Sequence, residues 1–419
     1  MPILFALALC TLALLPVRAE QILVPMDTSQ RDHLRAYGLA FWTLERGIPV
    51  EWLLNYRGGA FLVEAHALIA SEAILRGVST EHISEAQVTQ IYAEIDASNM
   101  EVVRLEKVPK IAVYTPPNKQ PWDDAVTLAL EYAQIAYEKI WDDEVLQGAL
   151  DDYDWLHLHH EDFTGQYGKF YGSYSNQVWY RDQQVAYEQM ARRLGYAKVS
   201  EQKKAVVVKI YEYMAAGGFL FAMCSATDTF DIALAALDVD ICPAVFDGDP
   251  ADPNAQAQLD FSRTVAFENF VLETNPLVYE FSTIDTTPDD MRRVRTAEAE
   301  YFTLFEFSAK YDPVPTMLTQ CHTNIVDGFL GQTTAFRQSL IKDSVILLAQ
   351  EEGTDRVKYI HGRVGKGTFT FYAGHDPEDH RHHVHDPPTN LTLHPNSPGY
   401  RLILNNVLFP AAKKKERKT

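Results

Sequence analysis

The sequence predicts an α/β protein whose core is a doubly wound, mostly parallel sheet of the flavodoxin-like kind. The clearest observation is residues 219–223, an apolar run that ends at a cysteine and small polar residues and is followed by a run with helical character over 230–236. A run without polar alternation is typical of a parallel strand buried on both faces. Several such runs alternate with helical stretches along the chain, which favours a parallel sheet with helices on both faces.

The composition is that of an ordinary globular protein, with 47% hydrophobic and 22% charged residues over 419 positions. This length supports two or three domain-sized units and a large core. The formal net charge of −20 argues against a nucleic acid or an anionic membrane as partner. We therefore expect a small molecule, a carbohydrate or a peptide as the substrate.

The first segment, residues 1–19, has the pattern of a secretory signal peptide. A short apolar run precedes small residues at Val17 and Ala19, the positions that signal peptidases prefer before a cleavage site. The run is too short for a comfortable membrane span, which predicts an exported protein, periplasmic or secreted, without a stable membrane anchor. At the other end, residues 413–419 form a basic tail that we expect to be solvated.

Removal of the first segment leaves three cysteines, Cys224, Cys242 and Cys321. At most one disulfide can form among them, and the sequence leaves its pairing open. At least one thiol therefore stays free in an oxidising compartment.

Two strand-and-helix regions follow the signal segment. In the first, residues 20–107, apolar runs at 21–26 and 50–55 flank helical periodicity over 27–47, which predicts a βαβ extension. The second region, residues 108–412, continues the alternation to the closing helix. Its main predicted elements are strands at 111–114, 153–160, 219–223 and 368–372 and helices at 122–137, 184–194, 200–216 and 399–408.

Cys224 stands where the strand at 219–223 turns into the following helix. Ligands of open α/β sheets bind outside the carboxyl ends of such strands. A nucleophile on this turn would have backbone N–H groups nearby to hold an oxyanion. The alternative is a buried structural thiol, since free cysteine is among the most buried residue types.

Two segments carry a family resemblance. Cys224-Ser225-Ala226-Thr227-Asp228-Thr229 and the late strand Gly365-Lys366-Gly367-Thr368-Phe369-Thr370-Phe371-Tyr372-Ala373-Gly374-His375 resemble the class I glutamine amidotransferase-like superfamily, in its ThuA-like (trehalose utilisation) branch. The similarity covers about residues 108–412. The whole chain also resembles exported bacterial proteins often labelled asparagine synthetase B, although the motifs of an ATP-dependent synthetase are absent.

The resemblance implies a cysteine-dependent amidohydrolase or amidotransferase. By position, Cys224 is the nucleophile, His375 its base and Glu378 the carboxylate that orients the imidazole, with Asp376 as the alternative orienting group. The thiolate would attack an amide or related carbonyl carbon. Residues expected to contact the substrate are Ser225, Asp228, His159 and Glu161.

A second hypothesis rests on histidines. His157-Leu158-His159-His160-Glu161-Asp162 ends a predicted strand, and more histidines follow His375. Such side chains are ligands for Zn²⁺ or a similar ion, and the candidate set is His159, His160, His375 and His382. The alternative functions are then a metal-dependent or carbohydrate-related hydrolase. A third reading is a non-catalytic ligand-binding module, which the aromatic residues between Phe163 and Tyr180 would suit.

Overall fold

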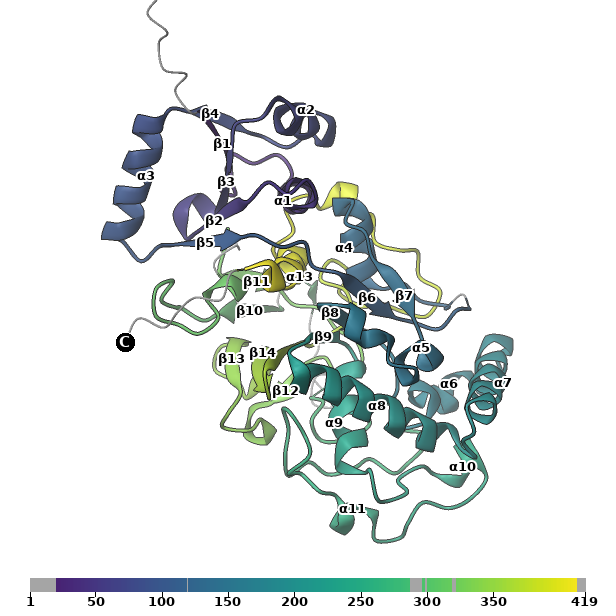
Figure 1. The fold of residues 1–419 in the computed structure, drawn as a ribbon. Coiled ribbons are helices and arrows are strands. Elements are labelled where there is room, and N and C mark those ends of the chain that lie inside the picture. Colours follow the sequence, from purple (N-terminus) through teal and green to yellow (C-terminus); the bar gives the residue numbers. More distant parts are fainter. Residues whose placement is uncertain (1–19, 119, 287–295, 298–299, 319–321, 413–419) are drawn as a thin grey trace, which may run out of the picture.

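The computed structural model describes residues 20–118, 120–286, 296–297, 300–318 and 322–412. It is an α/β fold with two sheets (Figure 1), so the predicted fold class is confirmed at that level. The predicted signal segment, Cys321 and the basic tail lie outside the described residues. Among those residues, no helix combines the length and the apolar character needed to cross a membrane.

The N-terminal region has the predicted strand, helix and strand in that order, but its sheet is antiparallel and the two predicted strands are not neighbours in it. The order is β4 (Glu81–Ile83), β1 (Gln21–Val24), β3 (Ala60–Glu64), β2 (Val50–Leu54) and β5 (Glu101–Leu105). The chain reverses after β2 through Asn55 and Gly59, both with positive φ, and β3 therefore pairs with β2 as a hairpin. Strand β3 thereby separates β1 from β2, although helix α1 (His33–Glu45) connects them in sequence.

The larger sheet has a parallel half and an antiparallel half. The parallel strands are β15 (Gly367–Tyr372), β9 (Phe219–Met223), β8 (Trp155–Leu158), β6 (Ile111–Tyr114) and β7 (Glu138–Ile140), in that order. The antiparallel strands continue beyond β15 as β14 (Arg356–Val364), β13 (Ile346–Gln350), β10 (Tyr301–Leu304) and β11 (Ile325–Asp327), with β12 (Phe336–Arg337) paired to β14. The sheet is therefore mixed rather than mostly parallel.

Two apolar cores lie against the parallel strands, one on each face. In β6, Ile111 and Val113 point into one core while Ala112 and Tyr114 point into the other, as strand alternation requires. The first core includes α1, α4 (Ala125–Ala133) and α13 (Pro398–Leu408), and the second includes α5 (Asp142–Leu146), α8 (Val199–Ala216) and α9 (Ala226–Ala235). The other helices are α2 (Ala67–Arg76), α3 (Glu85–Ala97), α6 (Tyr171–Tyr174), α7 (Val178–Arg193), α10 (Ala244–Asp247) and α11 (Ala255–Gln258).

The strand at 219–223 and the helix after it are confirmed as β9 and α9. Asp231 of α9 is fully buried and accepts backbone N–H bonds from Val265, Ala266 and Phe267 at 2.7–2.8 Å. This carboxylate therefore anchors the long segment after α9 to the face of the sheet.

We expect Asp231→Asn to lower the free energy of unfolding by about 2–4 kcal/mol. The amide keeps one acceptor oxygen but turns an NH₂ group toward backbone donors, which leaves buried groups unpaired. Chemical denaturation of the purified variant measures this loss. Asp343→Asn, at an exposed position, is the matched control and should unfold like the wild type. Equal stability of the two variants would contradict the anchoring role.

Candidate functional site

Four neighbouring parallel strands end at one edge of the sheet and supply the site. His159 and His160 follow β8, Cys224 follows β9 and His375 follows β15. The loop after β6 leads to Asp124, the N-cap of α4. Because β6, β8, β9 and β15 are adjacent and parallel, their carboxyl ends meet in one place, where ligands of α/β sheets bind.

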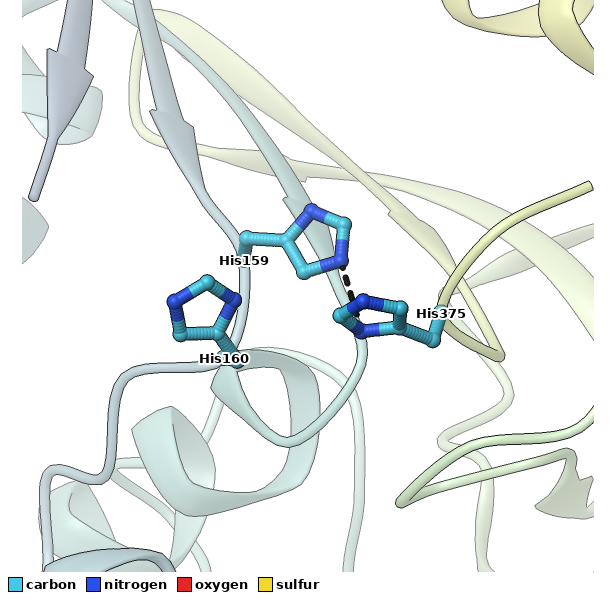
Figure 2. Close-up of side chains that lie close together, drawn as sticks. All are labelled: His159, His160 and His375. Carbon is cyan, nitrogen blue, oxygen red and sulfur yellow. Dashed lines mark hydrogen bonds between the residues drawn. The ribbon is translucent and has the colours of Figure 1, made fainter. Parts of the chain in front are cut away.

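His159, His160 and His375 form a three-histidine cluster at this edge (Figure 2). His159 Nε2 lies 3.1 Å from His375 Nδ1. One ring nitrogen from each of the three histidines lies within 4.8 Å of a ring nitrogen of the other two. The rings of His159 and His375 are nearly perpendicular, with centroids 4.6 Å apart. The structure thus brings together three of the four predicted metal ligands.

His160 is the least satisfied member of the cluster. Both of its ring nitrogens are buried, and neither has a hydrogen-bond partner among the described residues. Its ring lies edge-on to Trp122 at 5.0 Å between centroids. A buried polar group without a partner costs about 1–3 kcal/mol, so its position calls for an ion or a water that completes it.

Asp124 lies behind the cluster and caps α4. Its Oδ1 accepts N–H bonds from Val126 and Thr127 and lies 3.4 Å from His159 Nδ1, while its Oδ2 lies 3.2 Å from His157 Nε2. His157 and His159 help to hold the pKa of Asp124 well below its usual value despite burial, so Asp124 is a carboxylate. A carboxylate at Nδ1 leaves Nε2 of His159 facing His375, which is the usual arrangement behind a metal-bound histidine.

Asp123 and His382 lie on the far side of His375. His382 Nε2 is 3.1 Å from Asp123 Oδ1, and His375 Nε2 is 3.9 Å from the same oxygen. The rings of His375 and His382 stack at 4.2 Å between centroids. His382, the fourth predicted ligand, therefore contacts the cluster through His375 and does not join the nitrogens of His159 and His160.

Burial sets the charge of these imidazoles. It lowers the pKa of His375 to about 4, and, together with the neighbouring histidines, it holds the pKa of His160 well below its usual value. Both rings are therefore neutral near pH 7, which is the form that ligates metals.

Cys224 lies at the predicted turn but in an unfavourable setting for a nucleophile. Its φ is +51°, a strained value for a residue with a side chain, and its N–H donates to the carbonyl of Gly374. Burial, with Asp228 and Asp285 nearby, raises the pKa of the thiol to about 12. Cys224 and Cys242 are both free and buried.

The expected orienting carboxylate is elsewhere. Glu378 was expected to orient the imidazole of His375, but its Oε2 lies 2.9 Å from Nδ1 of another histidine, His394. Asp376 is fully buried and accepts hydrogen bonds from the Tyr400 hydroxyl and the Glu378 N–H. The carboxylate nearest to a ring nitrogen of His375 is that of Asp123. This part of the prediction is corrected, because the turn after Asp376 carries Glu378 toward the segment 394–397.

The residues predicted to contact a substrate are buried. Asp228 accepts the Thr333 hydroxyl at 3.0 Å, and the Ser225 hydroxyl has no hydrogen-bond partner among the described residues. Glu161 accepts the N–H of His159 at 2.9 Å. Together with His160 and Trp122, Glu161 lines an enclosed cavity of about 10 Å³. Of the four predicted substrate contacts, Glu161 is therefore the one that lines this small cavity beside His160.

Asp123 and Asp124 are site residues that the sequence pattern did not predict. Both were assigned to a helix at 122–137, whereas α4 begins at Ala125 with Asp124 as its cap. An aspartate just before a helix is a typical N-cap, and the preceding strand ends at the same sheet edge. These two signals together could have placed a carboxylate there.

We expect Cys224 to react slowly with iodoacetamide in the folded protein near neutral pH. A thiol pKa about three units above that of free cysteine leaves roughly a thousand-fold less thiolate. Mass spectrometry of the Cys224 peptide measures the rate, with denatured protein as the fast control. A fast reaction that is lost in His375→Ala would instead support the thiol mechanism.

We expect Asp124→Asn to weaken metal binding about 10–100-fold, because the charge behind His159 is removed while the cap oxygen is kept. The melting temperature should change little, since Asn is as good an N-cap as Asp. Asp124→Ala should lose metal affinity and also about 1 kcal/mol of stability. Equal metal affinity in Asp124→Asn and the wild type would exclude this positioning role.

Comparisons with known proteins add little to this site. No protein-family model matches the chain, and no curated protein matches it. Two cytoplasmic proteins from Salmonella typhimurium align over 73% of this chain and 100% of their own, with TM-scores of 0.35 and identities of 10% and 14%. An exo-beta-1,4-mannosidase from an Opitutaceae bacterium aligns over 63% of this chain and 31% of its own, with a TM-score of 0.27 and 11% identity. Similarity this low shows neither a shared fold nor a shared activity.

Proposed function

We propose that this chain is a metal-dependent hydrolase whose Zn²⁺ or similar ion is held by His159, His160 and His375. The observation that carries the proposal is His160. Its two buried ring nitrogens have no hydrogen-bond partner in the described part of the chain, and they lie beside the 3.1 Å pair formed by His159 and His375. Three imidazoles that converge in this way are a ligand set of catalytic zinc sites, which keep a fourth position for water.

The surroundings of the cluster fit this role. The enclosed cavity beside His160 has room for about one water molecule. Of the three histidines, His160 is the one that lines this cavity. A metal held by the three histidines would lower the pKa of a bound water toward 7 and polarise a carbonyl or phosphoryl oxygen. Glu161 borders the same cavity and is positioned to exchange a proton with a group inside it. Behind the cluster, the Asp124 carboxylate lies 3.4 Å from His159 Nδ1, as an outer carboxylate does behind a metal-binding histidine.

Three further predictions from the sequence remain part of this proposal: the substrate class, the doubly wound core and export. A carbohydrate-related hydrolase is the alternative that the aromatic side chains beside His160, among them Trp122 and Phe170, suit, although the cavity that they line holds only about one water. A doubly wound, amidotransferase-like core is supported by the helices on both faces of the parallel strands. Export is supported by the signal pattern of residues 1–19.

A thiol mechanism is the second candidate, and one observation favours it. Cys224 has a positive φ at a strand-to-helix turn, as nucleophiles on α/β folds often do. Its raised pKa weighs against it, since the thiol is then protonated near neutral pH and a thiolate is not ready. Slow alkylation of Cys224 would remove this candidate.

We expect the metal-free protein to bind Co²⁺ with the visible spectrum of a nitrogen-coordinated ion. His159→Ala and His375→Ala should each weaken this binding by more than about 100-fold, because changes behind a ligand alone cost about 10–100-fold. His82→Ala, at an exposed position on β4, is the matched control. The Zn²⁺ form should hydrolyse members of an ester, phosphate ester and glycoside panel, and a chelator should abolish this activity. Unchanged Co²⁺ binding in both variants would contradict the proposal.

A further inference from the structure

A second group of ligand atoms lies directly beside the three-histidine cluster and shares one residue with it. The group is Asp123, His375 and His382, and its ligand atoms lie within 4.8 Å of one another. The shortest separation is 3.1 Å, between His382 Nε2 and Asp123 Oδ1. These two atoms do not meet hydrogen-bond geometry despite their separation, and both are buried. The two atoms are therefore close together, buried and without a hydrogen bond to each other, which leaves both lone pairs available to an ion.

His375 presents a different ring nitrogen to each group. Its Nδ1 faces His159 Nε2 at 3.1 Å, whereas its Nε2 is 3.9 Å from Asp123 Oδ1. The two nitrogens of an imidazole lie on opposite sides of the ring. One side of His375 therefore completes the three-histidine cluster, and the other side faces Asp123 and His382.

A carboxylate lies behind His382 as well, and here it forms a hydrogen bond. His382 Nδ1 lies 2.9 Å from Asp379 Oδ2, which leaves Nε2 directed at Asp123. An outer carboxylate behind a histidine fixes its ring and its tautomer for metal binding. The stacking of His382 on His375 adds a second restraint on its position.

We propose that Asp123, His382 and Nε2 of His375 bind a second divalent cation, so that His375 bridges two metals as an imidazolate. The inference rests on the proposed metal-dependent function. Each metal takes one ring nitrogen of His375, and the ring N–H proton is released to solvent. The second position combines two nitrogens with a carboxylate oxygen, a mixed set that suits Zn²⁺ and Cu²⁺.

The first test is the number of metals per chain. Metal-free full-length protein is titrated with Zn²⁺, dialysed and analysed for bound metal. We expect two equivalents for the wild type, one for His382→Ala and two for His383→Ala, an exposed neighbour on the same loop. One equivalent in the wild type overturns the second site and leaves the proposed function intact. No bound metal overturns both.

The second test is magnetic and probes the bridge itself. The protein is titrated with Cu²⁺ and followed by electron paramagnetic resonance. We expect the signal to grow over the first equivalent and to fall over the second, because an imidazolate couples the two spins. His382→Ala should retain the signal of a single uncoupled ion. A wild-type signal that grows over both equivalents shows two unconnected sites and overturns the bridge.

Discussion

The parallel pairing of β15, β9, β8 and β6 is the constraint on which the candidate site depends. These strands are adjacent, and alternate residues along each of them are buried in two different cores. A shift of one residue would exchange the two faces, so the register is strongly determined. The strand pairing thereby holds the carboxyl ends of the four strands together, so this placement does not depend on the side chains that follow them.

Burial then decides what those side chains can do. It keeps His160 and His375 neutral and keeps the Cys224 thiol protonated. The same environment favours a metal and disfavours a thiolate, since a neutral imidazole is a ligand and a protonated thiol is a poor nucleophile. The two proposals therefore compete for the same sheet edge, and the electrostatics of the edge favour the metal.

Two consecutive aspartates from one loop contact different histidines of the site. Asp124 caps α4 and lies behind His159, whereas Asp123 lies beside His375 and His382. A helix cap that also orients a metal ligand ties the stability of α4 to the geometry of the site. It also explains how neighbouring residues can have different roles, one as an outer carboxylate and the other as a proposed ligand.

The sequence by itself determined the local parts of this protein. The strand at 219–223, the turn at Cys224 and the strand before His375 follow from apolar runs and small turn residues, which act over a few positions. Tertiary structure alone decided which side chains contact one another at the site. Glu378 pairs with His394. Asp123 lies beside His375 although it stands more than 250 positions earlier in the chain. The antiparallel half of the large sheet and the placement of β3 between β1 and β2 were likewise decided by tertiary structure. Such contacts depend on how long loops fold back over the sheet, and hydrophobic periodicity carries no information about that.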